Sequence, residues 1–206
     1  MFGAAPVSAQ STPTNNTAQP NGHPVADTVK FLAGGALGLG MHETGHLLFD
    51  EIFDAHPRVK GVHFGPFPFF AITHRPDLSP RREFTVSSAG FWVQEATNEW
   101  ILTRNPSTRA RDGWLTKGLL AFNVLNSVGY ALVAFARAGP AERDTRGMAA
   151  SLDLDERIVG ALVLAPAVFD AYRYFRPESR WAVWTSRATK AGSVLLVLKR
   201  TSSSRR

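Results

Sequence analysis

The sequence contains no cysteine. Disulfide bonds, thiolate nucleophiles and thiolate metal ligands are therefore excluded. A bound metal ion would have to be held by histidine, aspartate or glutamate. Charged residues are also scarce, because they make up 19% of the 206 residues while hydrophobic residues make up 44%. A chain of this length and composition is expected to fold around one core.

A cluster of basic and aromatic residues is missing as well. The formal net charge of +6 would suit a nucleic-acid partner if Lys and Arg gathered on one face with aromatic residues between them. They occur instead in short groups beside apolar stretches, such as Arg81 with Arg82 and Lys199 with Arg200. Such flanks are typical of proteins held in an anionic bilayer. We expect a lipid bilayer and no nucleic acid as partner, with a solvated basic surface as the alternative.

The two ends of the chain differ in composition from the middle. Residues 1–26 are rich in Ala, Pro, Ser, Thr, Asn and Gln, which predicts a disordered arm. Within it, Val7-Ser8-Ala9 resembles a signal-peptidase site, so the arm is either a signal-peptide remnant or an ordinary tail. Residues 199–206 form a basic C-terminal tail in this interpretation, and residues 27–198 form one helical domain.

Most of that domain has helical patterning. The stretch between Lys117 and Arg137 carries no charged residue and is long enough to cross a membrane. Gly34 and Gly38 have the spacing that lets a neighbouring helix approach closely. Residues 61–72 are aromatic and interrupted by prolines, which favours a short hairpin or a re-entrant loop. The remaining apolar runs predict helices over residues 27–54, 84–103, 113–138, 156–175 and 181–198.

These elements predict a mainly α fold, a membrane-embedded helical bundle with a short hairpin or re-entrant loop after the first core helix. The mean hydropathy of −0.10 is low for a protein with several membrane spans. A peripheral or soluble helical protein therefore stays open as an alternative.

Residues 42–46 read His-Glu-Thr-Gly-His, an HExxH pattern. On a helix, His42 and His46 lie one turn apart on the same face, so both imidazoles can bind one zinc ion. Glu43 projects about 100° around the helix axis from His42, where it can act as a general base that activates a zinc-bound water. The alternative is that both histidines are hydrogen-bonded structural residues.

A catalytic zinc site needs a third protein ligand and keeps its fourth position open. Asp170 is the candidate, because a carboxylate in an apolar stretch is costly unless it pairs or binds a cation. A salt bridge from Asp170 to Arg173 or to another arginine is the alternative explanation. Glu95 and Glu99 are the competing third ligands.

The order of these features resembles the site-2 protease family of intramembrane zinc metalloproteases. Carried onto this sequence, the resemblance implies His42, His46 and Asp170 as metal ligands and Glu43 as catalytic base. The family's Ala-Gly-Pro-x-x-Asn element is matched in part by residues 89–94, where Phe replaces Pro and Gln replaces Asn.

The resemblance also implies a function. It is zinc-dependent hydrolysis, with one Zn²⁺, of peptide bonds in or near membrane segments of a membrane protein or peptide substrate. The expected location is a bacterial-type inner membrane. Two alternatives remain: a non-catalytic integral membrane protein that binds a metal or a partner, and a membrane-associated metallopeptidase that uses Glu95 or Glu99.

Overall fold

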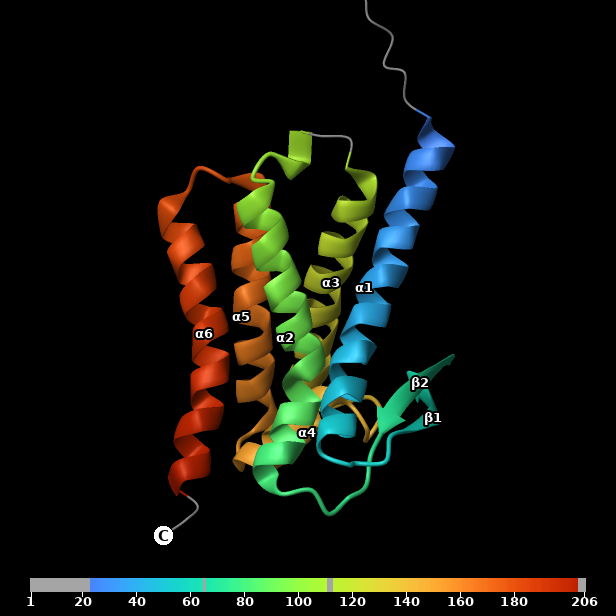
Figure 1. Cartoon of the computed structure of the whole chain (residues 1–206), viewed down its shortest axis with the longest axis vertical. Coiled ribbons are helices and arrows are strands. Elements are labelled where there is room, and N and C mark those ends of the chain that lie inside the picture. The colour runs from blue at the N-terminus through green and yellow to red at the C-terminus, as the bar shows by residue number, and fades with distance from the viewer. Residues whose placement is uncertain (1–22, 65, 111–112, 204–206) are drawn as a thin grey trace, which may run out of the picture.

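The computed structural model describes residues 23–64, 66–110 and 113–203, and it is mainly helical, as predicted. Long helices run side by side, with a hairpin and a short helix near one end of the bundle (Figure 1). The helices are α1 (Pro24–Ile52), α2 (Pro80–Arg104), α3 (Trp114–Ala136), α4 (Asp144–Leu152), α5 (Glu156–Phe175) and α6 (Arg180–Ser203), with a 3₁₀ turn at Thr108–Ala110. The strands are β1 (Arg58–Phe64) and β2 (Phe67–Thr73).

Glycines bring α1 and α3 into close contact. A Cβ added at Gly34 would lie 2.0 Å from the carbonyl oxygen of Leu115, and one added at Gly118 would lie 1.9 Å from that of Phe31. No side chain fits at either position, so the two backbones can touch. Gly38 faces the ring of Phe122 in the same way, which confirms the close helix approach expected from the glycine spacing.

The segment after α1 is an antiparallel hairpin. β1 pairs with β2 in a register that runs from Arg58 opposite Thr73 to Phe64 opposite Phe67. Of the two predicted forms, the hairpin is therefore the one observed, and it begins a few residues earlier than expected. It lies beside the C-terminal part of α1 (Figure 1).

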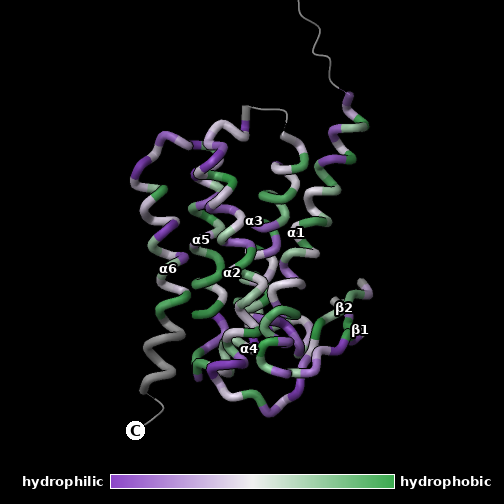
Figure 2. Tube along the Cα trace, in the orientation of Figure 1, coloured by the Kyte–Doolittle hydropathy of each residue, from purple (hydrophilic) through white to green (hydrophobic). Residues whose placement is uncertain are grey.

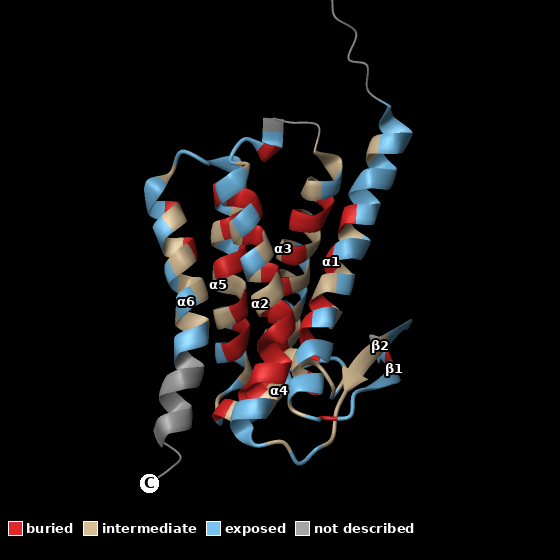
Figure 3. Cartoon of the chain, viewed as in Figure 1, coloured by how far each residue is buried: buried red, intermediate tan, exposed pale blue. Residues whose placement is uncertain are grey.

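The first half of α2 is the most continuously buried part of the bundle (Figure 3). Phe84 and Phe91 of α2 share one hydrophobic cluster with Met148 of α4 and Val159 of α5. The apolar side chains of α4 are thus held against two long helices. This packing fixes the position of Asp144, the first residue of α4.

Several predicted boundaries need correction. No helix was predicted between those over residues 113–138 and 156–175, but this interval contains α4. Residues 24–26 belong to α1 and not to the predicted arm, whereas residues 1–22 lie outside the described part of the chain. Residues 199–203 continue α6 and do not form a separate tail. The helix predicted over 156–175 has the observed bounds of α5.

Within the described residues, α3 and α5 are long and apolar enough to cross a membrane. This result rests on length and composition, and the core helix of a soluble protein can pass the same test. Figure 2 shows apolar segments in both helices. Of the most apolar window, 33% is buried in α3 and 39% in α5, so most residues of each window are at least partly exposed.

Candidate metal centre

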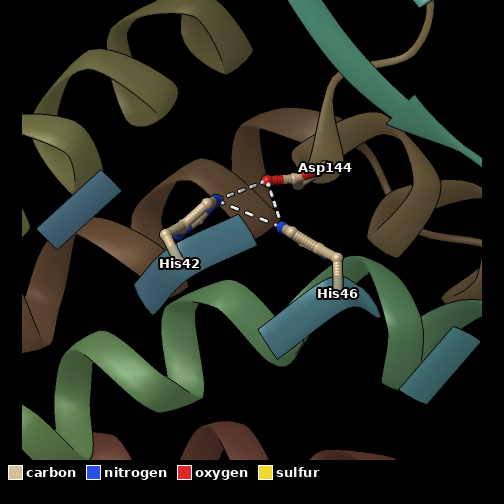
Figure 4. Close-up of side chains that lie close together, drawn as sticks. All are labelled: His42, His46 and Asp144. Atoms are coloured by element: carbon tan, nitrogen blue, oxygen red, sulfur yellow. Dashed lines mark hydrogen bonds and ion pairs between the residues drawn. The ribbon is translucent and has the colours of Figure 1, made fainter. Parts of the chain in front are cut away.

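Two helices that are far apart in sequence bring three ligand atoms together (Figure 4). His42 and His46 lie one turn apart on α1, as predicted, and both are buried. Their Nε2 atoms are 3.1 Å apart. Asp144 Oδ2 lies 3.2 Å from Nε2 of His42 and 3.3 Å from Nε2 of His46.

These three distances match a tetrahedral zinc site. Ligand atoms about 2.0 Å from a tetrahedral zinc ion are separated from one another by about 3.3 Å. The two nitrogens and the oxygen are 3.1–3.3 Å apart, which is the spacing of one face of such a tetrahedron. The donor set of two imidazoles and one carboxylate is also one that zinc accepts, so the residues present fit the ion and leave a fourth position open.

The second ring nitrogen of His46 adds to this fit. His46 Nδ1 donates a hydrogen bond of 2.8 Å to the carbonyl oxygen of Val86 on α2. With its proton on Nδ1, the His46 ring presents the Nε2 lone pair to a metal. His42 Nδ1 is buried without a hydrogen-bond partner among the described residues.

A glycine of α2 makes room for both rings. A Cβ added at Gly90 would lie 2.4 Å from Cε1 of His42 and 2.6 Å from Nε2 of His46. The Ala89-Gly90 pair, which carried part of the family resemblance, therefore lies directly against the two imidazoles.

The charge of Asp144 also suits a ligand. Burial would raise the pKa of its carboxyl group, but the charges and hydrogen bonds of His46 and His42 outweigh burial and lower the pKa well below its usual range. Asp144 therefore carries a negative charge beside the two imidazoles.

A buried ion pair next to Asp144 holds the start of α4 in place. Arg143 donates to both carboxylate oxygens of Glu156, each at 2.6 Å, and to the carbonyl oxygen of Pro140 at 2.7 Å. The hydroxyl of Thr145 donates to the same Glu156 carboxylate at 2.8 Å. The residues before and after Asp144 are thus both tied to the first residue of α5.

The ligand atoms open into a cavity of about 580 Å³ that Glu43 also lines. Its wall is formed by α1, α3, the hairpin and the segment that leads into α4. Apolar side chains from these elements dominate the wall, among them Phe70 of β2 and Phe122 of α3. The predicted base and the ligand atoms therefore share one space in which a substrate has room to bind.

Asp170, the predicted third ligand, lies elsewhere. Its carboxylate is buried and accepts hydrogen bonds from Asn98 at 3.1 Å, Ser186 at 2.7 Å and Lys190 at 2.8 Å. Arg173 lies 3.6 Å from it, so the alternative of a salt bridge is the one observed. Arg173 of α5 and Lys190 of α6 supply the positive charge beside this carboxylate, in place of the predicted metal ion.

Glu95 and Glu99 are not brought to the imidazoles either. Glu99 accepts hydrogen bonds from Arg173 at 2.5 Å and Arg187 at 2.8 Å. Glu95 lies next to Ser193 of α6. Within the described residues, His42, His46 and Asp144 are the group of three side chains whose ligand atoms can meet at one ion.

The sequence offered little sign of Asp144. The residue lies in a charged segment that contains Gly and Pro, and no apolar pattern marks it as buried. The one signal present was weak: Met148 and Leu152 lie four residues apart, which is the spacing of one helix face.

No family model, curated protein or solved structure matches this chain. The likeness to site-2 proteases therefore rests on the residues and their arrangement.

Proposed function

We propose that this protein is a zinc-dependent metalloendopeptidase that hydrolyses peptide bonds in or near membrane segments. The observation that carries the proposal is the spacing of the two His Nε2 atoms and Asp144 Oδ2, which corresponds to three corners of a zinc tetrahedron. In this proposal the third zinc ligand is Asp144 and not Asp170, while His42 and His46 keep their expected roles.

Each residue of the site has a separate task. When bound, zinc lowers the pKa of a water in its open position to about 7 and polarises a substrate carbonyl group. Glu43 lines the same cavity, so its carboxylate can take a proton from the attacking water and later deliver it to the leaving amine. The hydrogen bond from His46 to Val86 holds one ring in the tautomer that binds metal.

Outward-facing apolar side chains support a location in a membrane. Leu32 on α1, Leu132 on α3 and Trp184 on α6 are each more than 60% exposed. Contiguous exposed apolar surface is costly in water but suits a bilayer. Because α3 and α5 also meet the length needed to span, we propose that the bundle is embedded and that an apolar substrate segment reaches the cavity from the bilayer.

The decisive experiment replaces Glu43 and leaves the ligands intact. Zinc-loaded protein in detergent is incubated with β-casein and with a quenched fluorescent peptide of apolar residues. The wild type is expected to cleave at least one of them and to stop reversibly when zinc is chelated. Glu43→Gln is expected to keep zinc and to lose at least about 1000-fold in rate, since both general-base and electrostatic roles depend on its charge.

Glu51→Gln is the matched control, because Glu51 is an exposed glutamate near the end of the same helix. It is expected to cleave at the wild-type rate. If Glu43→Gln cleaves as fast as the wild type, the peptidase proposal is wrong. Zinc binding without any cleavage by the wild type would favour the non-catalytic metal-binding alternative.

A further inference from the structure

Tyr130 of α3 lines the cavity beside the candidate metal ligands. Its side chain lines the cavity together with Glu43, His42 and Asp144. Its ring packs edge-to-face on Phe91, with centroids 5.1 Å apart, and lies 6.0 Å from the ring of His42 at a tilt of 31°. Two aromatic contacts therefore fix the ring, and with it the direction of the hydroxyl group.

Tyr130 shares this cavity with the two acidic groups of the site. Asp144 is the third ligand and Glu43 is the proposed base, and the side chains of all three line the same space. A substrate bound beside the ligand atoms would therefore contact the Tyr130 side chain. A tyrosine hydroxyl has one proton that it can donate to such a substrate.

Peptide hydrolysis needs a donor at this place. As the nucleophile adds to the scissile carbonyl group, its oxygen gains negative charge, and a donor that is already oriented stabilises this charge most effectively. Two other polar side chains that line the cavity are already engaged. Asn126 donates to Gln94, and Arg143 donates to Glu156.

We propose that Tyr130 is a catalytic residue whose hydroxyl donates a hydrogen bond to the oxyanion of the transition state. This inference rests on the proposed peptidase function. The hydroxyl donates to the developing oxyanion and keeps its proton throughout, so no covalent bond to the tyrosine forms or breaks. The hydrogen bond is made in the transition state, and its loss should therefore lower kcat and not raise KM.

The test removes the hydroxyl and keeps the ring. Tyr130→Phe retains the contacts with Phe91 and His42, so the variant is expected to fold and to bind zinc as tightly as the wild type. Its kcat should fall about 100-fold or more, with KM changed less than about threefold. Tyr172→Phe is the matched control, since Tyr172 is an exposed tyrosine on α5, and it should behave like the wild type.

A second readout does not depend on turnover. A phosphinic peptide with leucine side chains on both sides of the phosphinate imitates the tetrahedral transition state. Tyr130→Phe should bind it at least tenfold more weakly than the wild type in calorimetry, while a leucine-rich product peptide binds both proteins equally.

Two outcomes would overturn the inference. One is a Tyr130→Phe variant that keeps both kcat and phosphinate affinity within twofold. The other is a loss of zinc affinity in this variant, since the hydroxyl would then serve Asp144 and not the substrate. Failure of the proposed function looks different: the wild type would cleave neither substrate and would bind the phosphinate no more tightly than the product peptide.

Discussion

The contacts of His42 and His46 with α2 determine whether a metal can bind between the two imidazoles. The hydrogen bond from His46 to the Val86 carbonyl selects the ring tautomer, and the missing side chain of Gly90 leaves space for both rings. The sequence predicted the two imidazoles because residues four apart on a helix share a face. It could not predict the contact with Gly90, which depends on how α2 packs against α1.

The first prediction concerns Gly90. In Gly90→Ala the new methyl group would overlap both imidazoles, so the rings must move and zinc affinity should fall at least tenfold. Gly129→Ala is the matched control, because a Cβ at this exposed cavity residue meets nothing within 4 Å. Zinc titration in the presence of a competing chelator measures the zinc affinity of both variants. Equal affinities would mean that the packing of Gly90 does not limit the site.

His74 connects the hairpin to helices α1 and α2. His74, just after β2, donates a hydrogen bond of 2.7 Å from Nε2 to Glu83, and its Nδ1 lies 3.5 Å from Asp50. The hydrogen bond to Glu83 is the main reason that the pKa of His74 is raised above its usual value of 6.5. The charged imidazole is therefore favoured in the folded protein.

A raised pKa gives this contact a defined pH dependence. Its stabilisation is complete below the unfolded pKa of about 6.5 and is lost as the pH rises through the folded pKa. His74→Gln should lower the free energy of unfolding by about 2 kcal/mol at pH 6 and by clearly less at pH 9. Thermal unfolding at both pH values measures the difference, with His63→Gln on β1 as an exposed control. An equal loss at pH 6 and pH 9 would exclude a charged His74.

At the scale of helices and connections, α4 is the element that completes the site. The sequence predicted the long helices because their apolar residues recur over many turns, and the bounds of α5 were predicted correctly. It did not predict α4, a short helix within a charged segment, because nine residues carry too little periodicity. Asp170 was chosen as third ligand for the same reason: its apolar surroundings were visible in the sequence, whereas the position of Asp144 was not.

The ion pair that anchors α4 should therefore control metal binding. Arg143→Met removes the donor to Glu156 and should weaken zinc binding about 10- to 100-fold, because the segment that carries Asp144 loses its support. Arg137→Met is the control: Arg137 pairs with Asp155 in the same connection, but that ion pair is exposed to solvent, so its loss should leave zinc affinity and stability close to those of the wild type.

Zinc titration and thermal unfolding of both variants separate the two effects. A loss of stability in Arg143→Met without a loss of zinc affinity would contradict the positioning role of the ion pair.

At the scale of the whole molecule, the bundle has polar clusters in its interior and exposed apolar side chains on several helices. Asp170, Arg173 and Ser186 are buried, whereas leucines and tryptophans on the outer helices are exposed. This arrangement supports the proposal of a membrane location. The uncharged stretch of α3 predicted one span from sequence, and the arrangement of the other helices around it was needed to recognise the outer surface.

A membrane location is tested by fractionation. The protein expressed in bacterial cells should sediment with membranes and remain there after extraction with alkaline carbonate, since exposed apolar faces of several helices would contact lipid. Detergent should release it. Recovery in the carbonate supernatant would indicate a peripheral or soluble protein, and the proposed embedding in a bilayer would be wrong.

The central claim is that His42, His46 and Asp144 hold one zinc ion, and X-ray absorption of the purified zinc-loaded protein tests it most directly. Two imidazole nitrogens and one carboxylate oxygen at about 2.0 Å are expected, with one zinc per chain. Asp144→Asn should lose most of the zinc, while Asp170→Asn, its buried counterpart, should retain it. Full zinc binding by Asp144→Asn, or its loss in Asp170→Asn alone, would contradict the account.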